Sequence, residues 1–315
     1  MTVRLPKYLP IILGFTVVLS NGCAAEPSGR RTLFETPVAK EKAKATWKTV
    51  FTGGSRIATV DGVKIWLSHP AVGPAKKAGQ PAPVDKKAFI DPILFGRTTP
   101  LAQGRTLRVM LDPGHGGTDP GAVSKTLKEG DVTLDIAKRT ADLLAKQGYS
   151  VRLTRTGNES VTLDRRTAMA EQWKADLFVS IHLNAAAAPS ATGIETFLIT
   201  PVGVKTTQQG DSGPPYVETP QRAYPGNAHA NENMRLAFAV HRRALNATAF
   251  TDRGIKTARF AVLRQAAMPA ILVECGFLSN PANATLHATP DGRARIASGL
   301  ALGIRDYAQG AIAPR

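Results

Sequence analysis

The residues after Arg105 alternate between strand-like and helix-like segments, and this alternation limits the folds that the chain can adopt. Short runs with the composition of strands lie at 107–111, 149–154, 176–182, 193–199, 255–263 and 269–275. Apolar residues at helical spacing lie at 131–148, 162–173, 233–248 and 292–308. Strands separated by helices form sheets that are covered by helices on both faces. We therefore predict an α/β fold with a largely parallel, twisted sheet between two layers of helices.

The chain of 315 residues could hold two domains, but its composition favours one domain with appendages. Residues 105–310 carry the α/β pattern, and roughly 200 residues are enough for one core without disulfides. Before them, residues 24–104 contain Pro-rich and Lys-rich stretches, as solvated linkers do. Within this tether, two β-rich runs at 56–67 surround Asp61–Gly62 and predict a hairpin that docks on the main domain.

Residues 201–232 interrupt the alternation, because they are rich in Gly, Pro, Gln and Thr. Such a long loop in a compact domain is usually functional or an insertion without fixed structure. We expect this insertion to be a lid, a wall of the substrate groove or a passive surface loop.

The first residues resemble a secretory leader. Basic residues precede an apolar run at 9–19, which is too short to span a bilayer. The junction before Cys23 resembles a lipobox, except that Leu19 lies four residues before the cysteine instead of three. Two outcomes stay open: lipidation of Cys23, with attachment to a membrane, or ordinary cleavage near Ala24 or Ala25. We predict a signal peptide over 1–23 and a protein that is periplasmic, anchored to the outer membrane or secreted.

The formal net charge of +16 favours encounters with anionic partners, such as membranes or cell-wall polymers. Nucleic acid is not expected, because the chain has no basic and aromatic recognition motif and only 6% aromatic residues. Cys275, the second of two cysteines, lies in an apolar run and is expected to be a buried thiol without a disulfide.

Four side chains suited to metal chemistry would meet at one edge of the predicted sheet. His115 follows a strand, His182 ends another and Glu274 lies near the end of a third. They therefore fall at the carboxyl edge, where open α/β folds place their sites. Glu129 lies in a loop before a helix that Asp131 can cap, and the loop can bring it to the same edge. Two imidazoles and one carboxylate form catalytic zinc sites with a position open for water, and another carboxylate can carry a proton.

These residues belong to motifs that follow one another in a fixed order from Leu107 to about Gly310. The motifs are Leu-Asp-Pro-Gly-His115-Gly-Gly, Lys128-Glu129-Gly-Asp-Val-Thr-Leu-Asp, Asp176-Leu-Phe-Val-Ser-Ile-His182-Leu-Asn-Ala, Arg253-Gly-Ile-Lys and Met268-Pro-Ala-Ile-Leu-Val-Glu274-Cys-Gly-Phe-Leu-Ser-Asn-Pro281. Together they resemble the catalytic domain of zinc-dependent N-acetylmuramoyl-L-alanine amidases, which detach the stem peptide from muramic acid in the cell wall. The resemblance implies that His115, Glu129 and His182 bind Zn²⁺ and that Glu274 is catalytic.

Asp112 and Asn184 are candidates for supporting roles. Asp112 precedes His115 and could orient an imidazole, or it could be a simple turn residue. Asn184 could contact substrate, support the site or cap a strand. Three arginines could hold peptide carboxylates, although structural roles are favoured; they are Arg155, Arg165 and Arg166. Four histidines without ligand spacing are not expected to bind zinc; they are His69, His229, His241 and His287.

The predicted activity is hydrolysis of the amide bond between N-acetylmuramic acid and L-alanine in peptidoglycan, by a monomer, for cell-wall remodelling or daughter-cell separation. The ligand set alone also fits another exported zinc hydrolase, such as a peptidase or a glycan deacetylase. A catalytically silent wall-binding protein is a third alternative. The presence of Glu274 argues against it, because a binding module has no use for a buried proton carrier.

Overall fold

The computed structural model describes residues 46–68, 71–72, 79–80, 85–96, 99–101, 104–204, 206–207 and 222–313. The predicted signal peptide with Cys23, His69 and residues 208–221 of the predicted insertion lie outside them. Every element below belongs to one compact unit, Lys44–Arg315. Among the described helices, none combines the length and the apolar character needed to cross a membrane.

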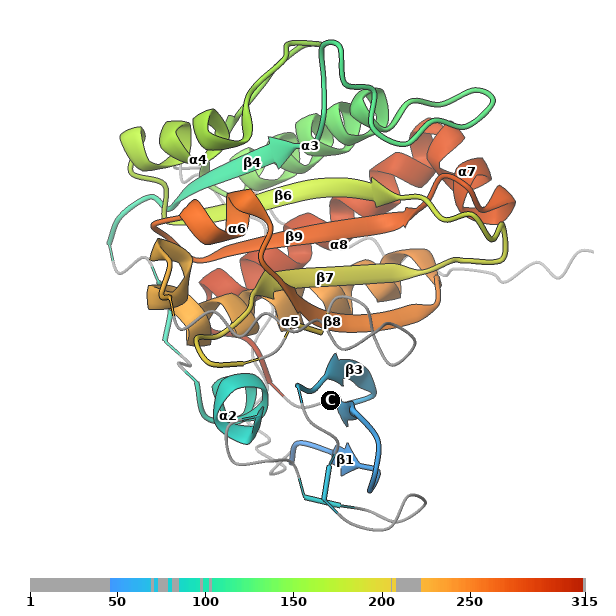
Figure 1. Cartoon of the computed structure of the whole chain (residues 1–315). Helices are drawn as coiled ribbons and strands as arrows, with labels where there is room; N and C mark the ends of the chain where they lie inside the picture. The colour runs from blue at the N-terminus through green and yellow to red at the C-terminus, as the bar shows by residue number, and fades with distance from the viewer. Residues whose placement is uncertain are drawn as a thin grey trace, which may run out of the picture. The chain divides into compact units, whose positions relative to one another are not determined.

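The described strands form one nine-stranded sheet in the order β1-β2-β3-β8-β7-β9-β6-β4-β5 (Figure 1). The strands are β1 (Thr49–Phe51), β2 (Ile57–Val60), β3 (Val63–Trp66), β4 (Arg108–Pro113), β5 (Ser150–Leu153), β6 (Leu177–Asn184), β7 (Ile194–Ile199), β8 (Asp252–Ala258) and β9 (Ala270–Phe277). Most neighbours are parallel, but β1–β2, β2–β3 and β7–β9 are antiparallel. The predicted α/β class with a largely parallel sheet is confirmed.

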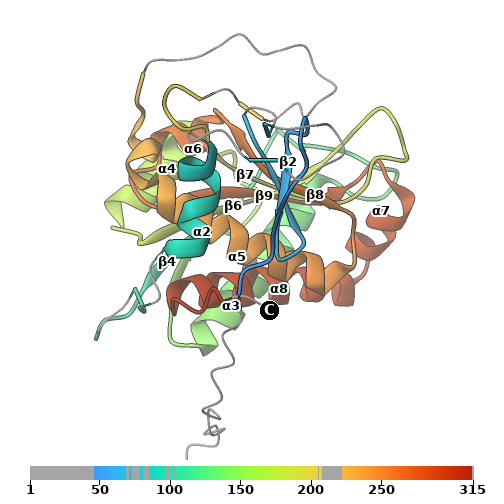
Figure 2. The ribbon, with the colours of Figure 1, turned by 90° about the horizontal axis from the view of Figure 1, so that it is seen from below.

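Helices cover both faces of the sheet (Figure 2). The helices are η1 (Lys86–Ile90), α2 (Asp91–Phe95), α3 (Glu129–Lys146), α4 (Leu163–Gln172), η2 (Pro225–His229), α5 (Ala230–Thr248), α6 (Ala261–Gln265), α7 (Pro281–Ala288) and α8 (Pro290–Ala308). The long helices α3, α5 and α8 pack together on one face, whereas α4 and the five-residue α6 cover part of the other.

The core consists of two clusters, one on each face, because successive side chains of a strand point to opposite faces. Val109 and Leu111 of β4 belong to the larger cluster, with residues of α3, α5 and α8. Met110 belongs to the smaller cluster, with Phe178 of β6 and Leu263 of α6. Shorter helices therefore cover less of this second face.

The structure differs from two predicted boundaries and contains one helix that was not predicted. Helix α3 begins at Glu129, so this residue is helical instead of lying in a loop, and Lys128 with an extended backbone takes the N-cap position predicted for Asp131. The strand predicted at 255–263 ends at Ala258, and α6 follows it. Helix α7 was not predicted, although the Asn280–Pro281 pair is a start signal: the side chain of Asn280 accepts hydrogen bonds from two backbone N–H groups of the first turn.

The described part of residues 46–104 contains more structure than the predicted tether with one hairpin. Strands β2 and β3 form the hairpin across Asp61–Gly62, where both residues have positive φ. Strand β1 pairs with β2, and η1 and α2 add a helical segment. The hairpin extends the main sheet, because Ile65 of β3 pairs in parallel with Ile255 of β8.

Candidate metal centre and active site

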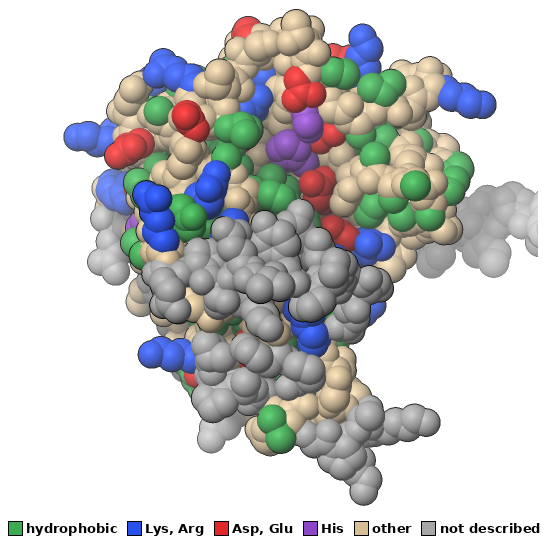
Figure 3. Space-filling model, in the orientation of Figure 1, with side chains coloured by type: hydrophobic (Ala, Val, Ile, Leu, Met, Phe, Trp, Pro, Cys, Tyr) green, Lys and Arg blue, Asp and Glu red, His purple; other side chains and the backbone are tan. Residues whose placement is uncertain are grey.

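The register of three adjacent strands places three polar side chains in one row. His182 of β6 lies opposite Glu274 of β9, and Glu274 lies opposite Glu195 of β7. Residues paired in this way share a face of the sheet. His115 follows the end of β4, and Glu129 is the first residue of α3. Histidine and acidic side chains accordingly gather on one exposed face of the molecule (Figure 3).

The two imidazoles and Glu129 converge on one point. Oε1 of Glu129 lies 3.1 Å from Nε2 of His115 and 3.0 Å from Nδ1 of His182. One ligand atom from each of the three residues lies within 4.8 Å of the others. Ligands of a tetrahedral zinc ion, bound at about 2.0–2.1 Å, lie roughly 3.3 Å from one another, and the two distances from Glu129 to the imidazoles are close to this value. The residues expected to bind a metal therefore lie together in the structure.

Glu129 is held in the ionised form that metal binding requires. Burial opposes its ionisation, but hydrogen bonds with His115, His182 and the backbone N–H of Leu183 outweigh burial and lower its pKa to about 2. Its Oε2 accepts a hydrogen bond of 2.8 Å from the N–H of Ala122. The bond to Glu129 in turn raises the pKa of His115.

The glycine-rich loop after β4 fits tightly around the two imidazoles. A Cβ atom on Gly114 would lie 2.3 Å from the ring of His182. Gly121 has a φ of +68°, and a Cβ there would lie 2.5 Å from Oε2 of Glu129. Side chains at these two positions would displace the expected ligands, so the loop requires glycine.

Asp119, which was not among the predicted site residues, orients one imidazole. Its Oδ2 lies 2.7 Å from Nδ1 of His115, which leaves Nε2 of the same ring facing Glu129. A carboxylate in this position fixes the tautomer and rotation of a metal-binding histidine. The available signal was a carboxylate four residues after His115 in the same loop.

Asp112 does not contact an imidazole. It is fully buried, and Oδ1 accepts hydrogen bonds from Oγ1 of Thr154 (2.6 Å) and Nη1 of Arg166 (2.7 Å), while Oδ2 accepts one from Oγ of Ser180 (2.7 Å). Neither of the two roles considered for Asp112 is seen, since it contacts no imidazole and lies within β4 instead of in a turn. Asp112 is linked to His115 only indirectly: its partner Arg166 donates a hydrogen bond of 2.8 Å to the carbonyl oxygen of His115.

The predicted proton carrier, Glu274, lies next to His182 in the sheet and keeps some contact with solvent, although many protein atoms surround it. Among the described residues, no group hydrogen-bonds to its Oε2. Burial, and next the negative charges of Glu129 and Glu195, raise its pKa well above the usual range of a glutamate. A carboxyl group with a raised pKa takes up a proton more readily than an ordinary glutamate, as a proton carrier must.

Asn184 and three charged residues extend the site along the sheet. Nδ2 of Asn184 lies 3.4 Å from Oε2 of Glu195, so this candidate lies beside the row of strand residues. Glu195 also pairs with Arg253 and Lys256 of β8. Both cations belong to the Arg253-Gly-Ile-Lys motif, whose charged residues had no predicted role.

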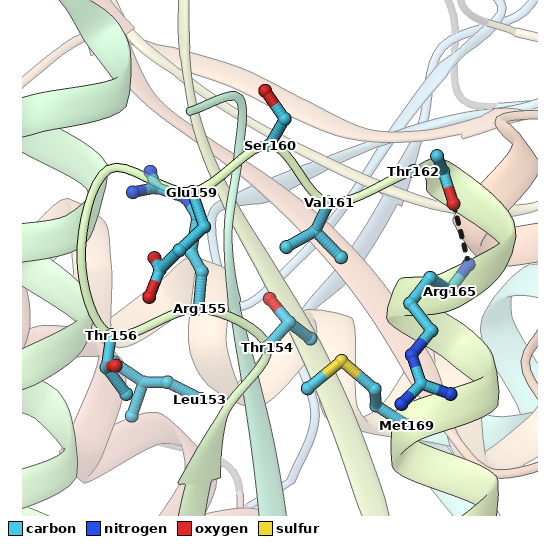
Figure 4. Close-up of a pocket in the computed structure, with 10 residues that line it drawn as sticks. All are labelled: Leu153, Thr154, Arg155, Thr156, Glu159, Ser160, Val161, Thr162, Arg165 and Met169. Atoms are coloured by element: carbon cyan, nitrogen blue, oxygen red, sulfur yellow. Dashed lines mark hydrogen bonds between the residues drawn. The ribbon is translucent and has the colours of Figure 1, made fainter. Parts of the chain in front are cut away.

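The other described candidates contribute no side chain to the metal cluster. The buried His241 bonds Thr196 and Asp252, and His287 is buried beside Phe250. Arg155 and Arg166 are buried and donate to backbone carbonyls of the glycine-rich loop. Arg165 lines an open pocket of about 480 Å³ between β5 and α4, and its backbone N–H bonds the side chain of Thr162 (Figure 4). None of the four residues of the predicted site lines this pocket.

Comparisons with known proteins identify the domain that carries this site. Residues 109–306 match the family described as N-acetylmuramoyl-L-alanine amidase. The sporulation-specific N-acetylmuramoyl-L-alanine amidase of Bacillus subtilis (strain 168) is 36% identical over 200 residues, which cover 63% of this chain and 67% of that protein. The amidase AmiC of Neisseria meningitidis serogroup B is 35% identical over 221 residues, which cover 65% of this chain and 53% of AmiC. The match thus spans about half to two thirds of these relatives.

Solved structures agree with this assignment. The catalytic domain of CwlV, an N-acetylmuramoyl-L-alanine amidase from Bacillus (Paenibacillus) polymyxa var. colistinus, superposes with a TM-score of 0.52 at 31% identity, covering 64% of this chain and 98% of that one. The amidase of Clostridium difficile 630 gives a TM-score of 0.53 at 34% identity, covering 64% of this chain and 96% of that one. Since the family match includes more than half of the chain and all four residues of the predicted site, the protein belongs to the N-acetylmuramoyl-L-alanine amidase family.

Proposed function

We propose that this protein is a zinc-dependent amidase that hydrolyses the amide bond between N-acetylmuramic acid and L-alanine in peptidoglycan. The observation that supports this most directly is the convergence of His115, Glu129 and His182 beside Glu274. The donor set fits Zn²⁺ because it combines two imidazole nitrogens with one carboxylate oxygen. The names of the family and of its relatives support the class of bond.

The residues around the cluster divide the chemical work. Bound zinc would supply a Lewis acid for the scissile carbonyl and would lower the pKa of a water molecule toward roughly 7. Asp119 holds the ring of His115 so that Nε2 stays available. Glu274 accepts the proton of the attacking water and delivers it to the nitrogen of the departing L-alanine, so the broken C–N bond ends as a carboxylate and an amine.

Two opposing influences set the protonation of Glu274. Burial raises its pKa, whereas a cation held by the neighbouring cluster favours its ionised form. The balance suits a group that must be ionised when water attacks and protonated when the amine leaves.

Purified sacculi provide the test of this activity. The protein should release stem peptides with a free L-alanine amine from the sacculi. A chelator should abolish this activity, and added zinc should restore it. The mass of the products separates the alternatives: cleavage within the peptide indicates a peptidase, loss of acetyl groups indicates a deacetylase, and retention on sacculi without products indicates a binding protein. Any of these three results would contradict the proposal.

Matched histidine variants test the metal ligands. His115→Ala and His182→Ala should each lose zinc and turnover, because two ligands rarely hold a catalytic zinc ion. His229→Ala is the control, since His229 ends η2 and lies outside the cluster. Stoichiometric zinc in the double variant of His115 and His182 would contradict the assignment.

The proposed substrate lies outside the cytoplasmic membrane, so the activity requires export. The leader predicted at 1–23 would provide it, with the protein either attached through a lipid on Cys23 or released. Fractionation of cells that express the wild type or Cys23→Ala distinguishes the two, because only a lipoprotein would move from the membrane to the soluble fraction on substitution.

A further inference from the structure

Two cations share one buried carboxylate beside the proposed catalytic edge. The side chain of Glu195 is 5% exposed, and its Oε1 accepts hydrogen bonds from Nε of Arg253 and from Nζ of Lys256, the latter at 3.1 Å. One negative charge thus faces two positive charges, so Glu195 alone does not neutralise both cations.

The open part of this cluster is the guanidinium fork of Arg253. Its side chain is 35% exposed, compared with 6% for Lys256, so only the arginine is available to a ligand. Its Cζ lies 4.9 Å from the centre of the Phe277 ring, and Nε is bound to Glu195. In the described part of the chain, the two Nη groups of Arg253 have no hydrogen-bond partner. A planar fork with two free donors is suited to a carboxylate.

A residue outside the matched family region contacts the backbone of Arg253. Nε1 of Trp66, in the hairpin strand β3, donates to the carbonyl oxygen of Arg253 at 2.8 Å. A Cβ on Gly254, which has a φ of +91°, would lie 2.8 Å from the Trp66 ring, and one on Gly193 would lie 2.8 Å from Cγ of Arg253. The close packing of these residues limits the positions that the arginine side chain can take.

The spacing of the strands gives the distance between this fork and the metal cluster. Strand β9 separates β6 from β7, so the backbones of His182 and Glu195 lie roughly 10 Å apart. Two residues of extended peptide span about 7 Å. When the scissile amide lies at the cluster, the second residue of the stem peptide therefore falls within reach of a guanidinium bound to Glu195.

We infer that Arg253 binds a free carboxylate on the second residue of the stem peptide and so selects peptides that carry it. This inference rests on the proposed amidase function. If the side-chain carboxyl of the second residue forms the peptide bond to the third residue, the α-carboxylate of the second residue stays free. Amidation of this α-carboxylate removes its charge.

The test compares two N-acetylmuramoyl tripeptides that differ only in an α-carboxylate or an α-carboxamide on the second residue. Arg253→Gln removes the charge, Arg253→Lys keeps it, and Arg139→Gln is the matched control. Arg139 also has a side chain that is 35% exposed and donates through Nε to a carboxylate, that of Asp135 on α3. Zinc content and thermal unfolding of each zinc-loaded variant report whether it is folded.

The wild type should prefer the carboxylate substrate. Arg253→Gln should lower kcat/KM for this substrate by roughly 10- to 100-fold and for the carboxamide by less than about 3-fold, because only the first loses a charge-assisted hydrogen bond. Arg253→Lys should restore part of the preference, and Arg139→Gln should keep it. Equal losses on both substrates, or none on either, would overturn the inference.

Binding measurements separate this inference from the amidase activity. Calorimetry with the two free stem tripeptides should show weaker binding of the carboxamide by the wild type and equal binding of both by Arg253→Gln. If the wild type hydrolyses neither substrate, the proposed function fails, and the calorimetric preference alone decides whether Arg253 recognises a carboxylate.

Discussion

Replacing Asp112 with alanine should strongly destabilise the domain, because it leaves a buried guanidinium without its counter-ion. The side chains of Asp112 and Arg166 are 1% and 5% exposed, and they lie 2.7 Å apart. Removal of one partner of such a pair costs about 3–5 kcal/mol. Domains are typically stable by about 5–15 kcal/mol, so the variant should lose a large fraction of its free energy of unfolding.

A double-mutant cycle tests whether the unpaired charge is the cause. Asp112→Ala and Arg166→Ala should each include the penalty of a buried, uncompensated charge, whereas the double variant removes both charges. The sum of the two single losses should therefore exceed the loss of the double variant by about 2 kcal/mol or more. Arg166→Ala should also weaken zinc binding by roughly 10- to 100-fold, because Arg166 holds the carbonyl oxygen of His115.

Urea unfolding followed by circular dichroism, in the presence of a chelator, gives the four free energies of unfolding without a contribution from bound metal. Arg139→Ala is a suitable control, because its partner Asp135 is 35% exposed and the pair should contribute less than about 1 kcal/mol. If the losses of Asp112→Ala and Arg166→Ala add within about 0.5 kcal/mol, the ion pair is not the source of the stability and the reasoning is refuted.

Three further predictions concern single side chains. Glu274→Gln should keep zinc and the fold but lower the rate on muropeptides by about 10²- to 10⁴-fold, since it removes the proton carrier; near-native turnover would show that another group is the base. Asp119→Asn should weaken zinc binding by roughly 10- to 100-fold in a competition with a chelating dye, and an unchanged affinity would mean that His115 is oriented by other contacts. Burial lowers the pKa of His287 to about 4. Between pH 6.5 and 4 the unfolded chain therefore binds a proton at this histidine that the folded chain does not bind. The free energy of unfolding should fall by about 3 kcal/mol as pH drops through this interval. His287→Leu should reduce this pH dependence in chelated protein, and equal slopes for variant and wild type would contradict the explanation.

The position of the metal cluster could be predicted because parallel strands end at the same edge of a sheet. His182 and Glu274 are separated by 91 intervening residues, yet both lie on strands with clear aliphatic patterns, and these strands pair directly. The prediction that Glu129 lies in a loop was wrong, because Asp131 is a good N-cap residue and suggested that the helix starts after it. The extended backbone of Lys128 starts the helix without a side-chain cap.

Glu195 and Asp119 could not be assigned from local patterns. Glu195 faces Glu274 only because β7 runs antiparallel to β9. The connection from β6 to β7 contains no helix, and such a connection cannot make the crossover that parallel strands need. Asp119 reaches His115 through a loop in which His115 itself has a φ of +59°, and no sequence period encodes that conformation.

The hairpin of β2 and β3 also determines which strand forms the end of the sheet. Without it, the part of β8 that pairs with β3 around Ile255 would present unpaired backbone groups to other molecules, close to Arg253. With it, the outermost strand is the three-residue β1, which offers little backbone for pairing between chains. A chain shortened to the matched region 109–306 would therefore expose an edge prone to self-association. For this protein, we expect the N-terminal strands to limit self-association of the sheet as well as to support the charged cluster around Arg253.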